Sequence, residues 1–366
     1  MPRPRPVTLQ DIALRAGVSK MTVSLSLRGH PDAAPTTRER IRLLAQEMGY
    51  RPNPLIVANM AQLRAGRREA FAGTIAFAGI GESPHRENPP NTQNVRIFGG
   101  AQRRAEALGY RIEWFPLHTP ALDGRRLTEI IKARGILGVV LGANQLVEPL
   151  WHFEWSQFAI AAIGRTEIAQ EVHRTVGDYY RAVREAYQRC RARGYRRIGL
   201  AVSREHDFAH QNLHRSAFLG AQADWPQADY VPPLVATEWK PGPFFEWVKQ
   251  HQPEVVIACY DDPIFWIRDA GLRIPEDIGL IRPHVNDHAL NVAGFLFDDA
   301  GLGAAAIDLV VEQLNHNERG IPDVVKRVLL PGRWTEGKSL RPAPAAVETS
   351  SPLLSEKFSC AHLPLS

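Results

Sequence analysis

The stretch TLQDIALRAGVSKMTVSLSLR, residues 8–28, predicts two short helices joined by a tight turn. Thr8 is a suitable cap for the first helix. Gly17 supplies the turn, because glycine adopts a positive φ without steric cost. Helical spacing places four apolar residues on one face of the first helix: Leu9, Ile12, Ala13 and Ala16.

The second helix of this pair has an unusual outer face. Ser19 can cap it, and Val23 and Leu27 point inward. The opposite stripe consists of Lys20, Met21, Ser24, Leu25 and Arg28. Cations can reach phosphates or guanine, and apolar groups can contact thymine methyl groups, so this face suits the major groove of DNA. The alternative is a helical hairpin whose outer methionine and leucine pack on another domain.

A third helix follows at once. PTTRE, residues 35–39, is a capping-box pattern with Thr36 as the cap and Glu39 three residues on. Gly49 ends the helix. Its inner stripe is Ile41, Leu44, Ala45 and Met48. Three short helices in residues 1–50 therefore predict a compact headpiece with one small core.

Basic charge is concentrated at the N-terminal end. Residues 1–68 hold twelve lysines and arginines and four acidic residues, a local charge of +8, whereas the whole chain of 366 residues carries +5. This distribution favours a polyanionic partner and salt-sensitive binding. A solvated basic face without a partner is the alternative.

Composition also indicates the compartment. We find no apolar run long enough to span a membrane and no signal-peptide pattern at the N-terminus. Cys190, Cys259 and Cys360 are far apart and odd in number, so neither a disulfide framework nor a zinc spacing follows. The expected location is the reducing cytoplasm.

Residues 51–68 separate the headpiece from the rest of the chain. Two prolines make the start of this segment extended. Asn53 can cap a short helix over residues 55–64, with Pro54 at its first position. A helix of this length forms only when DNA or a paired copy holds it. A plain linker is the alternative.

VTLQDIALRAGVSKMTVSLSLRGHP (residues 7–31), followed by TRERIRLLAQEMGYRPNP (37–54), resembles the lactose-repressor/galactose-repressor (LacI/GalR) family of bacterial transcription regulators. The resemblance implies a helix-turn-helix headpiece, a hinge helix and a two-lobed effector domain like a periplasmic sugar-binding protein. It further implies a homodimer that represses transcription from a near-palindromic operator in double-stranded DNA. A small-molecule effector, a sugar or related polyol, would control operator affinity by allostery.

Two positions depart from the family pattern. In the family a leucine of each hinge helix wedges the minor groove open; the matching position here is Asn59, with the apolar Met60 beside it. The family's base-reading arginine aligns with Leu25. The residues expected to contact DNA are Arg5, Thr8, Ser19, Lys20, Met21, Thr22, Ser24, Leu25, Arg28, Asn53, Asn59 and Met60.

From residue 73 onward, strand and helix patterns alternate, which predicts an α/β domain with parallel sheets. The expected strands are 73–78, 110–115, 136–141, 159–163, 254–258 and 279–281, and residues 195–201 are expected to hold a helix end followed by a strand. The expected helices are 95–108, 122–133, 180–193, 265–270 and 303–314. The two halves of this pattern suggest two similar lobes with a cleft between them, spanning residues 69–340. Residues 341–366, rich in Pro, Ser and Ala, predict a disordered tail.

RGYRRIGLAV (193–202) and GLRIPEDIGLI (271–281) resemble the effector domain of the family. The resemblance carries over three effector-binding positions, Arg215, Trp239 and Asp261, which suit a polyhydroxylated ligand. A core tryptophan and a surface arginine are the alternatives. Tyr260 replaces a family asparagine, RPHV (282–285) replaces "GFDD", and the polar loop 81–94 adds a further possible contact.

Other chemistry has less support in the sequence. His206, His210 and His214 recur every four residues beside Asp207, a spacing that can bind zinc on a helix, but a loop is expected to leave His206 outside the helix. A solvent or pocket role is favoured, and we expect no metal or cofactor. The chain has no dinucleotide, GxSxG, HExxH, Walker or CxxC motif, so catalysis is not expected. A solute-binding module or sugar-acting enzyme fused to a headpiece, and an architectural DNA binder with vestigial lobes, remain alternatives.

Overall fold

A computed structural model describes residues 7, 9–27, 33–48, 50, 73–79, 93–117, 123–142, 152–164, 170–285 and 290–343. Several predictions lie outside these residues. They are the short helix at 55–64, most of the loop 81–94, the tail beyond residue 343, and the DNA contacts of Arg5, Thr8, Arg28, Asn53, Asn59 and Met60.

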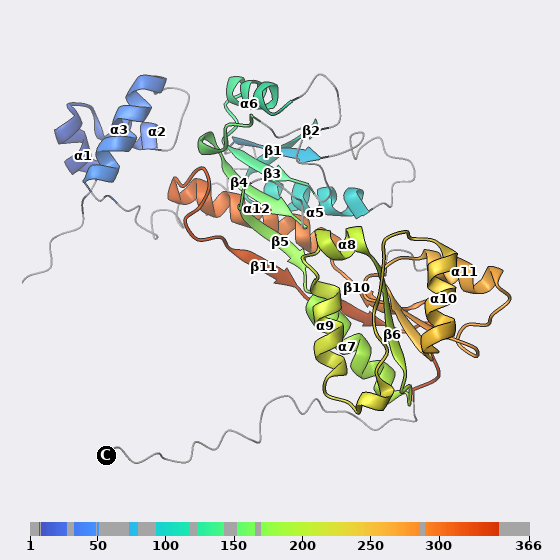
Figure 1. Ribbon diagram of the computed structural model, residues 1–366. Coiled ribbons are helices and arrows are strands. Elements are labelled where there is room, and N and C mark those ends of the chain that lie inside the picture. Colours follow the sequence, from blue (N-terminus) through green and yellow to red (C-terminus); the bar gives the residue numbers. More distant parts are fainter. Residues whose placement is uncertain are drawn as a thin grey trace, which may run out of the picture. The chain divides into compact units, whose positions relative to one another are not determined.

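Three helices form the headpiece: α1 (Leu9–Ala16), α2 (Lys20–Leu27) and α3 (Pro35–Glu47) (Figure 1). Gly17 has φ +67°, so it makes the predicted turn between α1 and α2. Every helix contributes to one core, whose buried members are Ile12, Ala13, Val23, Ile41 and Ala45. The three-helix prediction and its inner stripes are therefore confirmed.

The predicted start of α3 is wrong by two residues. Ala34 is the N-cap and makes no side-chain cap hydrogen bond, and Pro35 begins the helix. Proline suits this first position because its φ is already helical and it has no N–H group to satisfy. Thr36 therefore lies inside the first turn. Glu39 does not complete a capping box; its carboxylate accepts a hydrogen bond from Arg42 Nη2 at 2.7 Å.

The first lobe contains a six-stranded sheet of order β2-β1-β3-β4-β5-β11, in which every pair of neighbours is parallel. Its strands are β1 (Gly73–Gly79), β2 (Tyr110–Pro116), β3 (Gly138–Leu141), β4 (Ala159–Ile163), β5 (His173–Gly177) and β11 (Arg327–Leu330). Its helices are α5 (Gln93–Ala107), α6 (Gly124–Ala133) and α12 (Asp299–His316), with a 3-10 turn, η2, at Trp155–Gln157.

Helices cover both faces of this first sheet. Ile75 and Phe77 of β1 pack in one core with α5 and α12, whereas Ala76 and Ala78 pack in a second core with α6 (Figure 1). Successive side chains of a strand point to opposite faces, so β1 must be apolar on both. This explains why GTIAFAG reads as a continuous apolar run.

The second lobe repeats this topology. Its sheet has the order β7-β6-β8-β9-β10-β12, and only the edge strand β12 is antiparallel to its neighbour. The strands are β6 (Ile198–Ser203), β7 (Leu234–Ala236), β8 (Val255–Ala258), β9 (Gly279–Arg282), β10 (Ala293–Leu296) and β12 (Arg333–Thr335). The helices are α7 (Tyr179–Ala192), α8 (Arg204–Ala209), α9 (Leu213–Gln222), α10 (Pro241–His251) and α11 (Asp262–Asp269), with a 3-10 turn, η3, at Gln227–Asp229. Two similar lobes were predicted and are confirmed.

The lobes are not consecutive halves of the chain. One compact unit takes in residues 1–178 and 297–331, and the other takes in residues 179–296 and 332–366. The chain therefore crosses between the units three times. The long helix predicted at 303–314 runs from Asp299 to His316 and belongs to the first lobe, although it follows the second lobe in sequence.

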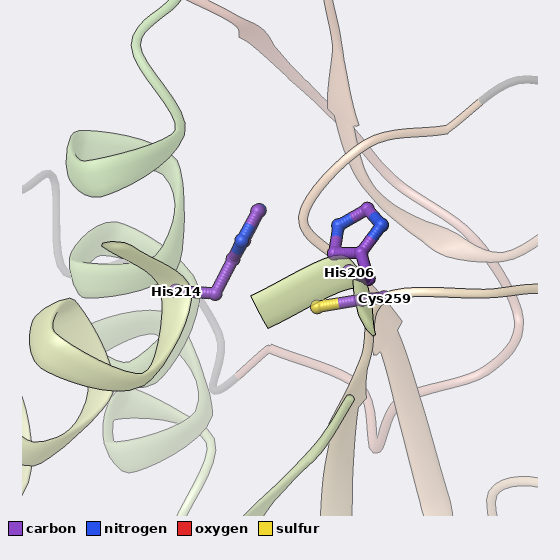
Figure 2. A group of neighbouring side chains, drawn as sticks. All are labelled: His206, His214 and Cys259. Carbon is purple, nitrogen blue, oxygen red and sulfur yellow. The ribbon is translucent and has the colours of Figure 1, made fainter. Parts of the chain in front are cut away.

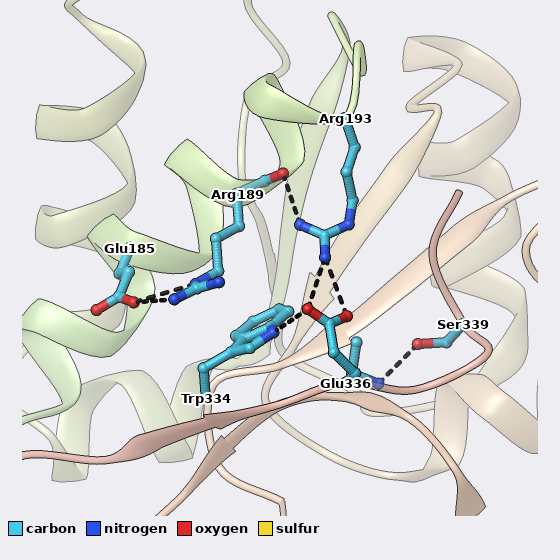
Figure 3. A network of polar contacts seen from close by, with 7 residues as sticks. Glu185, Arg189, Arg193, Trp334, Glu336 and Ser339 are labelled. Carbon is cyan, nitrogen blue, oxygen red and sulfur yellow. Dashed lines mark hydrogen bonds and ion pairs between the residues drawn. The ribbon is translucent and has the colours of Figure 1, made fainter. Parts of the chain in front are cut away.

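Polar contacts attach β12 to α7 in the second lobe (Figure 3). Arg193 Nη2 donates to both carboxylate oxygens of Glu336, at 2.9 and 3.0 Å, and Trp334 Nε1 donates to the same carboxylate at 2.7 Å. The Arg189 guanidinium lies 4.5 Å from the centre of the Trp334 ring. These contacts hold the last strand of the lobe against the helix that opens it.

The C-terminal boundary of the second lobe includes Arg341. Its N–H donates to the Tyr195 hydroxyl at 2.8 Å, and its guanidinium donates to Glu254 at 3.1 Å. The sequence placed Arg341 at the start of the tail, but these contacts assign it to the lobe. In the part of the chain described, no helix has both the length and the apolar character to cross a membrane.

Replacing Gln313 tests how much its contacts between α12 and β4 stabilise the first lobe. Gln313 is 3% exposed in α12, and its amide pairs with both the N–H and the C=O of Ile160 in β4, at 3.1 and 3.0 Å. Gln313→Leu should lower the free energy of unfolding by about 2–3 kcal/mol, because buried main-chain groups lose their partner. Urea denaturation measures this. Gln102→Leu, on the exposed side of α5, is the control; equal effects would contradict the prediction.

Candidate DNA-binding surface and effector site

Helix α2 is capped and anchored as the sequence predicts. Ser19 Oγ accepts the N–H of Thr22 at 3.0 Å, and the two side-chain hydroxyls lie 2.8 Å apart. Val23 is fully buried, and Leu27 packs against the headpiece core. The cap and core fix which side of α2 faces outward.

The outer face of α2 is most prominent at its first turn. Lys20 is exposed, and the Met21 side chain is 71% exposed, whereas Ser24 and Leu25 are half-buried. Ser26 is buried, a placement that the sequence did not assign. The headpiece therefore presents a cation and an apolar side chain on a helix that the core holds rigidly.

The second candidate site lies at the carboxyl edge of the second sheet. In parallel sheets, the residues that follow neighbouring strands meet at one edge, where ligands commonly bind. Strand β6 leads into α8, β8 leads into Tyr260 and Asp261, and β9 ends at Arg282. Side chains from three separate segments of the chain thus gather at this edge.

Arg215, predicted to bind effector, is engaged with an acidic residue. Its Nε lies 3.1 Å from Asp207 Oδ2. Asp207 is 1% exposed, and its Oδ1 has no hydrogen-bond partner among the described residues. Burial raises the pKa of Asp207, and the charge of Arg215 opposes this shift. The ion pair therefore holds the Arg215 side chain in place. It leaves Asp207 Oδ1 without a hydrogen-bond partner among the described residues.

Asp261, also predicted to bind effector, faces Arg282. Asp261 Oδ1 lies 3.2 Å from Arg282 Nε, and Arg282 Nη2 donates to the carbonyl of His284 at 3.0 Å. Burial lowers the pKa of Arg282, and Asp261 is the largest influence opposing this. The RPHV segment, which replaces "GFDD", thus places a buried cation at its first position, Arg282. The sequence analysis identified Arg282 as part of a departure from the family, but it did not predict that Arg282 pairs with Asp261.

Trp239, the third predicted position, lies among aromatic rings. Its ring centre is 5.0 Å from that of Tyr260 and 5.3 Å from that of Trp266. Trp239 Nε1 donates to Asp262 at 3.2 Å, and the Tyr260 hydroxyl lies 3.0 Å from Ser203 Oγ. The indole also packs against the lobe's core, so the core alternative is correct for part of its surface.

The three histidines meet at the same edge, but not on one helix. His206 lies inside α8 and His214 lies inside α9; Gln211 and Asn212, with φ of 54° and 57°, separate these helices. The expectation of a loop position for His206 is therefore wrong. The ring of His206 lies 4.0 Å from that of His210 and 5.1 Å from that of His214.

His206 connects the predicted positions. Its ring centre is 5.1 Å from that of Tyr260, which contacts Trp239, and its chain neighbour Asp207 pairs with Arg215. Burial, with the charges of His210, Arg282 and His284, lowers the pKa of His206 to about 3, so its imidazole is neutral near pH 7. The structure thus brings together the predicted residues with two that the sequence marked only as departures from the family, Tyr260 and Arg282.

Comparisons with known proteins agree with this architecture. Residues 8–53 match the model described as bacterial regulatory proteins, lacI family, and residues 187–340 match the periplasmic binding protein-like domain. The sucrose operon repressor of Pediococcus pentosaceus is 24% identical over 287 residues, covering 75% of this chain and 80% of that protein.

Solved structures share the fold. The lac repressor dimer bound to operator and the anti-inducer ONPF aligns with a TM-score of 0.53 at 18% identity, covering 92% of this chain and 99% of that one. The transcriptional regulator CelR in complex with cellobiose aligns with a TM-score of 0.55 at 19% identity, covering 92% and 100%.

A helix-turn-helix headpiece followed by two parallel α/β lobes defines a DNA-binding transcription regulator with a periplasmic-binding-protein-like domain. Its headpiece is a DNA-binding domain of the lacI family of bacterial regulatory proteins, and the relatives of the chain are regulators of that type.

Proposed function

We propose that this chain represses transcription as a homodimer on a near-palindromic operator, and that a carbohydrate bound at the second lobe changes its operator affinity. The names of its relatives support this: one is a sucrose operon repressor, one structure contains a repressor dimer on operator, and another contains cellobiose. We further propose that the lobes bind their ligand without transforming it.

The exposed first turn of α2 carries the DNA-binding proposal. Lys20 and Met21 project from a helix whose other side is held in the headpiece core, which is the geometry that a major-groove reader requires. The described residues proposed to contact DNA are Ser19, Lys20, Met21, Thr22, Ser24 and Leu25. Contacts by Arg5, Thr8, Arg28, Asn53, Asn59 and Met60 stay predictions.

The charge balance of the second-lobe edge favours a neutral, polyhydroxylated ligand. Arg215 pairs with Asp207, Arg282 pairs with Asp261, and the His206 imidazole is neutral. Charged groups that are already paired present hydrogen-bonding atoms at fixed positions, and they add little net charge to the site. Trp239 adds an aromatic surface of the kind that sugar rings stack on, and a few polar groups beside apolar walls are typical of ligand sites.

Lys20→Ala tests the DNA-binding proposal. If Lys20 contacts a base or phosphate, each lost contact should weaken operator binding by about 1–3 kcal/mol, and loss of a phosphate contact should also reduce the salt dependence. The operator is first selected from random duplexes with the full chain, and affinity is measured by fluorescence anisotropy at several salt concentrations.

Lys249→Ala is the matched control, because Lys249 is an exposed lysine in the last turn of α10 in the second lobe. It should bind operator as the wild type does. An unchanged affinity in Lys20→Ala would remove Lys20 from the interface.

A further inference from the structure

Three potential metal-ligand atoms converge in the second lobe. His206 of α8, His214 of α9 and Cys259, the residue after β8, each offer one such atom, and these atoms lie within 4.8 Å of one another (Figure 2). No such grouping follows from sequence spacing, because Cys259 is 45 residues from the nearer histidine. The topology brings the thiol to the histidines.

The surroundings make these side chains suitable donors. His214 is 3% exposed and Cys259 is 8% exposed, so bulk water has little access to the two side chains. A cation bound by the Cys259 thiol would displace its proton, because a coordinating thiol is deprotonated.

The charges around the three donors are compatible with a bound cation. Asp207 is buried beside His206 in sequence, one of its carboxylate oxygens has no hydrogen-bond partner among the described residues, and its charge acts on Cys259. The nearby Arg282 cation disfavours a second positive charge, but it pairs with Asp261. Arg215 and Arg282 are each already paired with a carboxylate, so a divalent ion that replaces the thiol proton adds one net positive charge to the site.

We propose that His206, His214 and Cys259 bind a thiophilic transition-metal ion of the Zn²⁺ class. Thiolate and imidazole are the ligands that this class prefers. Three protein donors leave at least one coordination position of a tetrahedral ion to water or another ligand. Bonds of about 2.0–2.3 Å require the donors to close by up to about 1 Å from a spacing of at most 4.8 Å.

His210 is not one of the three ligands, although it shares the four-residue spacing. Its ring stacks on His206 at 4.0 Å, and its Nδ1 lies 2.9 Å from the His206 carbonyl oxygen. It supports His206 from the side. The proposed site therefore differs from a three-histidine face on one helix, and it goes beyond the proposed function because metal binding needs neither operator nor carbohydrate.

Cobalt titration of the full-length chain tests the site. The protein is prepared without a polyhistidine tag, stripped of metal and kept under argon. One Co²⁺ per chain should bind and produce the near-ultraviolet thiolate-to-metal charge-transfer band, and Zn²⁺ should bleach it. Cys259→Ser should abolish the band, whereas Cys190→Ser, which changes the buried cysteine of α7, should keep it.

A second pair of variants separates ligands from neighbours. His214→Gln should weaken Co²⁺ binding by more than about 100-fold, beyond the loss typical of changes outside the ligand set. His210→Gln should weaken it by less than that. Circular dichroism and operator binding confirm that each variant is folded.

The cobalt spectra of the wild type and of Cys259→Ser can each overturn the proposal. A chain that binds no Co²⁺ or Zn²⁺ at micromolar concentration, or that binds Co²⁺ without the charge-transfer band, has no such site. A band that survives Cys259→Ser unchanged assigns the metal to another cysteine and is equally contrary.

Discussion

Replacing Gly100 by alanine is expected to destabilise the first lobe by about 3 kcal/mol or more, the upper end for overpacking a well-packed core. A Cβ atom on Gly100 of α5 would lie 2.0 Å from the carbonyl oxygen of Ala300. On the facing helix, a Cβ on Gly303 would lie 2.0 Å from the carbonyl oxygen of Ile97. Both obstacles are main chain, so neither can move aside as a flexible side chain does. Helices α5 and α12 must therefore separate.

Gly99→Ala is the matched control, since it makes the same change one residue earlier in the same helix. Its Cβ would meet only Arg103 Nη1 at 3.4 Å, the far end of a flexible side chain. Alanine is a better helix former than glycine by about 1 kcal/mol, so this variant should be as stable as the wild type or slightly more stable. Urea denaturation followed by circular dichroism compares the two. Equal midpoints would show that the helices have room at Gly100.

The headpiece could be predicted closely because its signals are local. Cap residues, one turn glycine and apolar residues at helical spacing lie within 42 residues, and Ile12, Val23 and Ile41 meet in the core as expected. The one error, at Thr36, arose where two local signals compete. Proline and a threonine cap each favour a helix start, and the proline prevails.

The two lobes could be predicted only as a pattern. Alternating strands and helices indicate parallel sheets, but they do not say to which sheet a late segment returns. Residues 297–331 rejoin the first lobe, where α12 supplies Gln313 to β4 and packs on α5 through Gly303. Such contacts join residues about 150 to 200 positions apart, and no local propensity encodes them.

The candidate effector site shows the same limit. Arg215, Trp239 and Asp261 were identified through the family resemblance, and the structure gathers them at one edge of the second sheet. Their partners were not identified, because each pairing links separate segments. Asp261, for example, pairs with Arg282, whose position the sequence marked only as a departure from the family.

Trp239→Ala is expected to abolish the effector response while leaving operator binding intact. The indole is half-buried beside Tyr260 and Trp266, so its removal takes away the main aromatic surface at this edge. Operator affinity is measured by anisotropy with a panel of mono- and disaccharides that includes sucrose and cellobiose. A sugar that shifts the wild-type operator affinity should have no effect on the variant at 100-fold higher concentration, about 2.7 kcal/mol of lost binding.

Trp225→Ala separates this effect from general loss of a tryptophan. Trp225 belongs to the same lobe, but it lies 4.0 Å from the Arg191 guanidinium in the last turn of α7, the helix that precedes the start of β6. It is therefore placed toward the opposite edge of the sheet and should respond to the sugar as the wild type does. An effector response that survives in Trp239→Ala would show that Trp239 only packs against Trp266. Removing a ring that contacts the ligand must weaken the binding of that ligand.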